Sequence, residues 1–329
     1  MRATIHDVAL VAKVSIKTVS RVLNDERYVR EDTRQRVRAA VAQLNFHPSA
    51  AARLLGGGRS YQIGFICDNP NPYYVFELQM GIRDRAAQDG VRVLAQPYDR
   101  DTDGLTAEIG ALIHATRVDG LILTPPVTDR RDVLDLLVGS SIPVVRVQPG
   151  SDHHLTPAVA IDNVAAARAM TEHLIARGHR RIGFIGGPDA FKVSGERRTG
   201  YEAALKAAGF PIDPALIAQG DFGVAAGSAG GALLIDAEAT AIFAASDAMA
   251  AGVLAEAHRR GMTLPRDLSV CGFDDSSLAS SVWPPLTTVR QPLRDIGWHA
   301  ADLLLTTDPD QPHRTLPFEI IERASTMHR

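Results

Sequence analysis

The chain has 329 residues, of which 45% are hydrophobic and 22% charged, a composition typical of a globular protein long enough for more than one domain. No apolar run reaches the roughly 18–20 residues that a membrane helix needs, and no signal peptide precedes the first expected helix, so we expect a cytoplasmic protein without a membrane partner. The two cysteines, Cys67 and Cys271, have no metal-ligand spacing and are expected to be buried thiols.

The charge is unevenly distributed along the chain. Residues 1–60 hold 11 Lys and Arg against 5 Asp and Glu, whereas residues 61–329 hold 24 against 33. A basic head in front of an acidic body indicates a polyanion as the partner of the head. Charge alone is a weak indication, because many small helical domains are basic without binding nucleic acid.

Three short helices are predicted at the start of the chain. Thr4 and Asp7 form a capping-box variant before the first helix, and Ser15 can cap the second. A third helix is expected over roughly residues 31–45. Two short helices joined at a tight corner near Lys13 and followed by a third are typical of a helix-turn-helix domain. The alternative is an ordinary helical hairpin with a solvated outer face.

The second expected helix carries the candidate DNA-reading residues. If Val19, Val22 and Leu23 face inward, the outer face consists of Ile16, Lys17, Ser20, Arg21 and Asn24. Arg and Lys can donate to guanine O6 and N7, Ser can bond a phosphate or base, and Ile can contact a thymine methyl group. After this domain, residues 49–60 are alanine- and glycine-rich and too short to hold a helix unaided, so we expect a linker that orders conditionally.

From Tyr61 onward the pattern alternates between strands and helices. Both halves of this region open with the same Ile-Gly-Phe-Ile run, at Ile63 and at Ile182. Short buried runs with little alternation are typical of parallel sheets covered on both faces. The expected strands cover residues 62–66, 91–95, 120–124, 143–147, 158–161, 181–186, 216–220, 241–245 and 268–273. The predicted fold is a small all-α helix-turn-helix headpiece followed by an α/β core of two Rossmann-like lobes.

Two such lobes would face each other across a cleft. Ligands of open α/β sheets bind beyond the carboxyl ends of the strands, so the candidate cleft residues are those that follow each strand. The loop at residues 68–75 is unusually polar and aromatic for such a position.

Several stretches resemble the lac-repressor (LacI/GalR) family of transcription regulators. The first is TIHDVALVAKVSIKTVSRVLN, and VREDTRQRVRAAVAQLNFHPSAAARLL resembles the rest of the family headpiece and its hinge helix. Further along, HRRIGFIGG, ERRTGYEAAL, SDAMAAGVL, LSVCGFDD and PPLTTVRQP resemble its core domain. One position departs from the family, which usually has Gly where this chain has Lys13. A left-handed backbone there would cost on the order of 1 kcal/mol.

The resemblance implies a headpiece at 1–48, a hinge helix and linker at 49–60, and a core at 61–329. Within the headpiece it implies that Ile16, Lys17 and Arg21 read bases, while Thr4, Ser15, Ser20 and Asn24 contact the DNA backbone or nearby base edges. It also places Ala52 and Leu55 against the minor groove, with Leu55 as a wedge that kinks the duplex. The alternative is that the linker leucines pack within the linker itself.

For the core, the resemblance implies a two-lobed receptor similar to a periplasmic sugar-binding protein. The first lobe would comprise about residues 61–161 and 291–319, and the second about 162–290 and 320–329. The effector-binding residues would be Asn69, Tyr73, Arg197, Phe222, Ser246 and Asp274. Arg197 can donate to two hydroxyls, Asp274 can accept from two more, and the aromatic rings offer flat faces to a sugar. Alternatively, Arg197 forms a surface ion pair, and Asp274 and Asp275 cap a helix at Ser276.

The expected function is that of a repressor of a carbohydrate catabolic operon. A homodimer would bind a palindromic double-stranded operator and be released by a small sugar-like effector. The alternative is a corepressor-dependent regulator that responds to a purine or another metabolite. A last strand-like stretch, LPFEIIERAS, covers residues 316–325, and no leucine heptads follow it, so no tetramer is expected.

Enzyme motifs are missing from the sequence. It holds no Walker loop, no GxGxxG after a strand, no HExxH and no GxSxG, so we expect no catalytic residue, cofactor or metal. Two rival classes remain, a solute-binding receptor with a vestigial head and a sugar-active α/β enzyme.

Overall fold

The computed structural model describes residues 3–23, 26, 28–46, 59–98, 104–306 and 312–329. Two compact units make up the chain, residues 1–61 with 115–119 and residues 62–114 with 120–329. Among the described residues, no helix is both long and apolar enough to cross a membrane.

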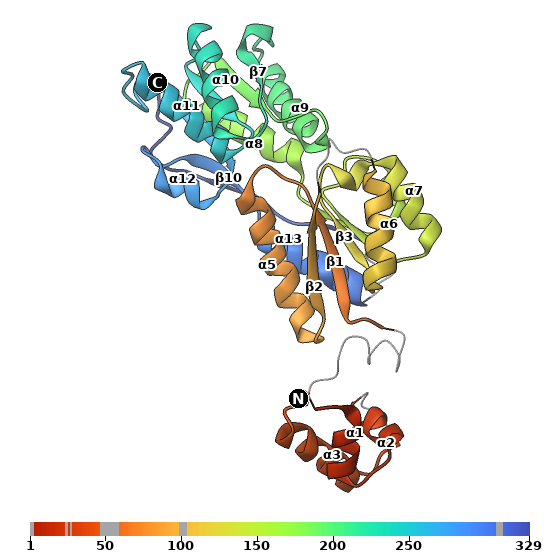
Figure 1. The fold of residues 1–329 in the computed structure, drawn as a ribbon. Helices are drawn as coiled ribbons and strands as arrows, with labels where there is room; N and C mark the ends of the chain where they lie inside the picture. Colours follow the sequence, from red (N-terminus) through yellow and green to blue (C-terminus); the bar gives the residue numbers. More distant parts are fainter. Residues whose placement is uncertain (1–2, 24–25, 27, 47–58, 99–103, 307–311) are drawn as a thin grey trace. The chain divides into compact units, whose positions relative to one another are not determined.

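The first unit contains a three-helix headpiece (Figure 1), formed by α1 (Ile5–Ala12), α2 (Ile16–Leu23) and α3 (Glu31–Gln43). Each helix contributes one fully buried valine to a common core, namely Val8, Val19 and Val37. The third helix is shorter than expected and ends at Gln43. Asn45 has a φ of 45°, and this left-handed backbone does not continue a helix.

The starts of α1 and α2 have the predicted caps. The Asp7 carboxylate accepts from the Thr4 backbone N–H at 2.7 Å, and the Thr4 hydroxyl accepts from the Asp7 N–H at 3.4 Å, which confirms the capping box. Lys13 follows α1 in the left-handed conformation, with φ 55° and ψ 47°. The Ser15 hydroxyl then accepts from the Thr18 N–H at 3.1 Å at the start of α2.

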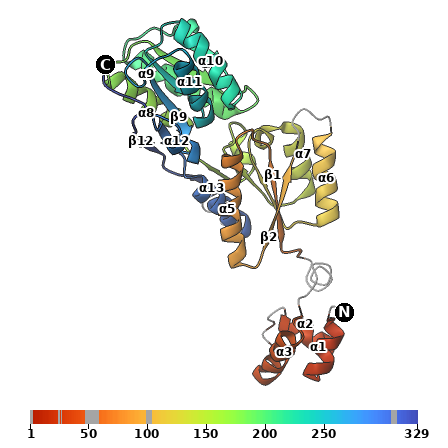
Figure 2. The ribbon, with the colours of Figure 1, turned by 60° about the vertical axis from the view of Figure 1, so that its left-hand side comes forward.

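The second unit contains two lobes (Figures 1 and 2), each built on a six-stranded sheet of described residues. The first sheet has the order β11-β5-β4-β3-β1-β2, and its pairs are all parallel. Its strands are β1 (Gln62–Cys67), β2 (Arg92–Pro97), β3 (Leu121–Leu123), β4 (Val144–Val147), β5 (Ala158–Ala160) and β11 (His313–Thr315).

The second sheet has the order β12-β10-β9-β8-β6-β7, and only β12 runs antiparallel to its neighbour. Its strands are β6 (Ile182–Gly186), β7 (Ile217–Gln219), β8 (Ala241–Ala244), β9 (Ser269–Asp274), β10 (Thr287–Arg290) and β12 (Glu319–Ile321). The chain therefore crosses between the lobes three times, after β5, after β10 and between β11 and β12. The predicted two-lobed parallel α/β core is confirmed.

Helices cover the faces of both sheets. In the first lobe these are α5 (Pro72–Gln88), α6 (Leu105–Thr116), α7 (Arg131–Ser140) and α13 (Leu293–Thr306). In the second they are α8 (Asn163–Ala176), α9 (Lys192–Ala207), α10 (Val224–Asp236), α11 (Asp247–Arg259) and α12 (Ser277–Ser281). Single 3-10 turns occur at η1 (Val127–Asp129), η2 (His153–Leu155) and η3 (Pro214–Leu216).

Helices α5 and α13 pack side by side through glycines (Figures 1 and 2). A Cβ at Gly81 would lie 1.8 Å from the Arg294 carbonyl oxygen, and one at Gly297 would lie 2.2 Å from the Leu78 carbonyl oxygen. Both distances are impossible for real atoms. The two backbones therefore touch directly, and this contact ties the crossover helix α13 to the first lobe.

Candidate functional site

The outer face of α2 presents most of the predicted DNA-reading side chains. Ile16, Lys17 and Arg21 are exposed and Ser20 is half-buried, while Val19 and Val22 of the same helix are buried. The Arg21 Nε lies 3.4 Å from the Glu26 Oε2 in an exposed ion pair.

Two other predicted DNA contacts are exposed but already engaged within the headpiece. The hydroxyls of Thr4 and Ser15 take part in the caps of α1 and α2. Three further predicted contacts lie outside the described residues, namely Asn24, Ala52 and Leu55.

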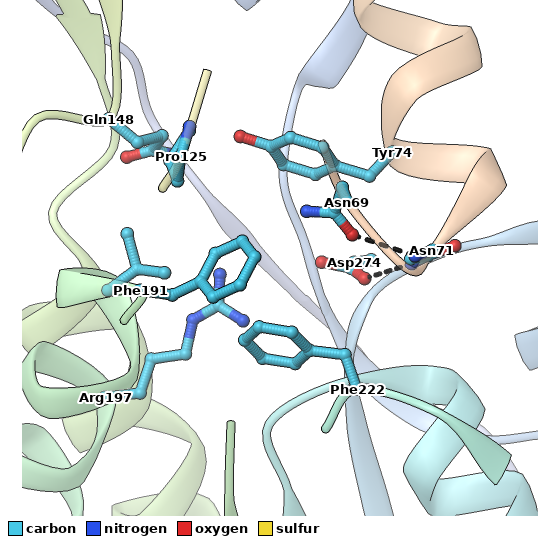
Figure 3. A pocket seen from close by; sticks show the side chains of 10 residues that line it. Asn69, Asn71, Tyr74, Pro125, Gln148, Phe191, Arg197, Phe222 and Asp274 are labelled. Atoms are coloured by element: carbon cyan, nitrogen blue, oxygen red, sulfur yellow. Dashed lines mark hydrogen bonds between the residues drawn. The ribbon is translucent and has the colours of Figure 1, made fainter. Parts of the chain in front are cut away.

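A cavity opens between the two lobes beyond the carboxyl ends of their strands (Figure 3). It encloses about 380 Å³ of space free of protein atoms, its open mouth included. Ten residues line it, five from each lobe: Asn69, Asn71, Tyr74, Pro125 and Gln148 from the first, and Phe191, Val193, Arg197, Phe222 and Asp274 from the second. Of the six predicted effector residues, the structure brings Asn69, Arg197, Phe222 and Asp274 together here.

Arg197 projects from the first half of α9 into the cavity wall. The side chain is only 4% exposed, so it is not the surface ion pair that was the alternative. Its Nη1 donates to the Ala245 carbonyl at 2.7 Å, and its Nε donates to Asn163 Oδ1 at 3.1 Å. Burial lowers the pKa of the guanidinium, and the nearby Asp274 carboxylate opposes that shift.

Asp274 ends β9 and is also buried. Its Oδ1 accepts from Gln291 Nε2 at 2.7 Å and its Oδ2 from Asn71 Nδ2 at 2.8 Å. Burial raises the pKa of this carboxyl to about 6. Asp274 does not cap the following helix, because the Ser276 N–H donates to Asp247 Oδ2 at 2.6 Å instead.

Asp247 is a second buried carboxyl, close to Asp274. It starts α11, and its Oδ1 accepts from the Thr288 hydroxyl at 2.6 Å. Burial raises its pKa to about 8, with a further contribution from the negative charge of Asp274. The two carboxyls therefore compete for ionisation near neutral pH.

Tyr73 is placed differently from the expectation. Its Oη donates to the Asp275 carbonyl at 3.2 Å, and the side chain lines a separate polar pocket with Glu77 and Arg290. The tyrosine at the cavity is Tyr74, which is buried (Figure 3). Both residues belong to the first turn of α5, where a step of one residue changes the helix face.

Ser246 also has another role than the expected ligand contact. It does not line the cavity; its hydroxyl donates to the Phe222 carbonyl at 3.1 Å and accepts from the Met249 N–H at 3.1 Å as the cap of α11. Ser246 therefore fixes Phe222. The Phe222 ring meets that of Phe191 edge to face, with centroids 5.3 Å apart and planes at 89°.

Three cavity residues have left-handed backbones that are uncommon outside glycine. These are Gln148 with φ 51°, Phe222 with φ 68° and Asp274 with φ 115°. Such strain typically gathers at ligand sites, where the surrounding structure holds it in place. Among the described residues, no group of three or more His, Cys, Asp or Glu side chains is arranged to hold a metal ion.

Some cavity residues were not singled out from the sequence. Asn71 and Gln148 fall inside strand-end loops that the pattern does mark, and Asn71 precedes Pro72 as the cap of α5, which is a readable signal. Phe191 immediately precedes α9, and Val193 lies in its first turn. Neither residue carries a sequence signal of its own.

A three-helix headpiece followed by two parallel-sheet lobes around a polar cavity defines a class of ligand-responsive DNA-binding regulators. Residues 4–49 match the model for "bacterial regulatory proteins, lacI family", and residues 171–326 match the "periplasmic binding protein-like domain". The chain belongs to the LacI family, as its sequence predicted, and is a DNA-binding transcriptional regulator.

Individual relatives are similar over nearly their whole length. The regulator DegA of Bacillus subtilis is 35% identical over 303 residues, covering 90% of this chain and 89% of the relative. The repressor CytR of Escherichia coli K12 is 35% identical over 343 residues, covering 98% and 96%. Among solved structures, the lac repressor dimer bound to operator and the anti-inducer ONPF has a TM-score of 0.86 at 29% identity, covering 99% of this chain and 100% of that one. The CelR–cellobiose complex has a TM-score of 0.75 at 30% identity, with the same coverage.

Proposed function

We propose that this protein is a repressor whose hold on DNA is released by a small sugar-like effector bound between its lobes. In this proposal residues 1–48 read DNA, residues 49–60 form a hinge that pairs on the operator, and residues 61–329 bind the effector and join two subunits. The observation that carries the proposal is the cavity between the lobes, which the buried Arg197 and Asp274 both line. The headpiece, considered by itself, has an exposed outer face on α2.

The cavity chemistry favours a polyhydroxylated ligand. Arg197 offers only donors and the ionised Asp274 only acceptors, and a hydroxyl group can satisfy either. The rings of Phe191 and Phe222 add apolar surface against which the C–H face of a sugar can pack. Cellobiose occupies the similar regulator CelR, and ONPF occupies the lac repressor.

Release requires that the effector bind one lobe orientation more tightly than the other. A tenfold loss of operator affinity needs a difference of about 1.4 kcal/mol. In the DNA-bound form two hinge segments would pair, with Ala52 and Leu55 in the minor groove. The effector-bound form would separate them and withdraw the Leu55 wedge.

A thermal-shift screen tests the effector class. The wild-type protein is incubated with monosaccharides, disaccharides, glycosides, purine bases and nucleosides. Each hit is repeated with Asp274→Ala and with Asp213→Ala, which removes a carboxylate that caps η3 and does not line the cavity. We expect a sugar hit that Asp274→Ala abolishes and Asp213→Ala preserves. A hit that survives Asp274→Ala undiminished would place the ligand elsewhere, and purine hits alone would favour a purine-responsive regulator.

DNA reading is tested separately with Arg21→Ala. A genomic fragment selected by the wild-type protein serves as the operator probe in a gel-shift series, and Arg36→Ala on the exposed side of α3 is the matched control. Loss of a good base contact should weaken binding by about tenfold or more. Unchanged operator affinity for Arg21→Ala would overturn the assignment of α2 as the reading helix.

A further inference from the structure

Three buried amides join the cation and the anion of the cavity in one chain of hydrogen bonds. Arg197 Nε donates to Asn163 Oδ1 at 3.1 Å, and Asn163 Nδ2 donates to Gln148 Oε1 at 3.2 Å. Gln148 Nε2 then donates to Gln291 Oε1 at 3.0 Å, and Gln291 Nε2 donates to Asp274 Oδ1 at 2.7 Å. Each of the five residues is at most 5% exposed.

The two ends fix the direction of the whole chain. A guanidinium can only donate, and an ionised carboxylate can only accept. Every amide between them must therefore point its oxygen toward Arg197 and its nitrogen toward Asp274. Reversing or removing one amide leaves a donor or acceptor without a partner, which is costly for a buried side chain.

The chain also passes from one lobe to the other. Arg197 and Asp274 belong to the second lobe, but Gln148 follows β4 of the first lobe. Asn163 starts α8 directly after the first crossover, and Gln291 lies between β10 and α13 at the second crossover. The Gln148 Oε1 accepts in addition from the Ile161 N–H at 3.2 Å, within the first crossover.

We propose that Gln148 and Gln291 are positioning residues that hold the two lobes in this orientation and set the placement of Arg197 and Asp274. A ligand that bonds to Gln148 or Asp274 in the cavity competes with the chain, so cavity occupancy and lobe orientation are coupled through these amides. Only the competition between a ligand and the chain of hydrogen bonds rests on the proposed function. The positioning role itself concerns the protein without ligand or DNA.

Paired substitutions at Gln148 separate polarity from shape. Gln148→Met keeps the length but removes both hydrogen-bonding groups. In Gln148→Glu an ionised carboxylate accepts from Asn163 but cannot donate to Gln291, whereas the protonated acid has one donor and one acceptor, as the amide does. The glutamate variant should therefore regain the chain when the pH is lowered, and the methionine variant should not.

The readout is the interlobe distance between spin labels at Gln88→Cys in the first lobe and Lys206→Cys in the second. Both positions are exposed, and the native Cys67 and Cys271 are buried. We expect one narrow distance distribution from pH 5 to pH 8 for the labelled protein without a change at Gln148, because a protonated Asp274 keeps an oxygen that can accept from Gln291 Nε2. Gln148→Met should broaden it throughout, and Gln148→Glu should broaden it at pH 8 and restore it at pH 5. Wild-type distributions in both variants, or equal broadening that ignores pH, would overturn the proposal.

A double-mutant cycle gives a second measurement that does not depend on the labels. Unfolding equilibria are measured for Gln148→Ala, Gln291→Ala and their double variant. In the control cycle, Gln96→Ala on β2 takes the place of Gln148→Ala, alone and combined with Gln291→Ala. Residues in one hydrogen-bonded network should be non-additive by about tenfold in the unfolding constant, while the distant Gln96 and Gln291 should be additive to within about twofold. Additive effects of Gln148 and Gln291 would contradict the coupling. Both experiments omit ligand and DNA, so they remain decisive if the proposed effector class fails.

Discussion

The guanidinium carbon of Arg197 lies 3.6 Å from the centroid of the Phe273 ring, so the cavity arginine stacks on the β9 residue that precedes Asp274. A planar guanidinium can stack and donate along its edges at the same time, and an ammonium cannot.

We therefore expect Arg197→Lys to lower the free energy of unfolding by about 2 kcal/mol, because the Ala245 carbonyl and the Asn163 amide lose a well-placed donor in a buried site. Chemical denaturation measures the change. The adjacent Arg198, which is exposed and pairs with Glu202, provides the control, and Arg198→Lys should change stability by less than about 0.5 kcal/mol. Equal effects at the two positions would contradict the stacked arrangement.

The two buried carboxyls predict a pH-dependent stability. The folded-state pKa values of Asp247 and Asp274 are raised to about 8 and about 6, so both carboxyls are more easily protonated in the folded chain than in the unfolded one. Their contribution to stability is therefore fully present below about pH 4 and is lost as the pH rises through the folded-state values.

Asp247→Asn tests this directly. The asparagine can accept from the Ser276 N–H and donate to the Thr288 hydroxyl, so it mimics the protonated acid. The stability of the variant relative to wild type should rise between pH 5 and pH 8 by on the order of 1 kcal/mol or more. Urea denaturation across this range gives the difference, and a difference that stays constant with pH would show that Asp247 is not held in its neutral form.

The glycine contact between α5 and α13 predicts opposite effects of the same substitution. At Gly297 a methyl group would collide with the backbone of α5, so Gly297→Ala should destabilise the chain by about 2–3 kcal/mol. Gly110 lies within α6 with open space around its Cβ position, so Gly110→Ala should stabilise by about 0.5–1 kcal/mol. Thermal unfolding of both variants checks the signs, and a tolerated alanine at Gly297 would be inconsistent with backbone contact between the helices.

Lys13 predicts a local gain of stability in the headpiece. Its left-handed backbone is strained for a residue with a Cβ, so Lys13→Gly should stabilise the corner by about 1 kcal/mol. Lys17→Gly, inside α2, should instead destabilise by about the same amount. Hydrogen exchange of the α1 and α2 amides in the full chain distinguishes the two. Faster exchange in Lys13→Gly than in wild type would contradict the strain argument.

Local sequence signals predicted much of this molecule. The Thr4 and Asp7 capping box and the nine strand positions follow from spacing and residue type. Strand β10 was missed because Thr287 and Thr288 interrupt its apolar character, and β11 because it is a three-residue edge strand with two exposed residues. These strands depend on pairing with distant neighbours, which no local pattern records.

The cavity was predictable in location but only partly in membership. Strand ends marked the right loops, yet the choice between Tyr73 and Tyr74 depends on where α5 begins, and the role of Ser246 depends on the position of Phe222. Asn163 and Gln291 are ordinary polar residues in the sequence. They become significant only because two chain crossovers bring them beside Gln148.

The coupling between cavity and DNA is the step on which the proposed function depends most. Fluorescence anisotropy of a labelled operator fragment, titrated with wild-type protein with and without a saturating cavity ligand, measures it directly. We expect at least about tenfold weaker operator binding with ligand, corresponding to about 1.4 kcal/mol, and no such difference in Asp274→Ala. Operator affinity that stays the same when the cavity is saturated would contradict the account.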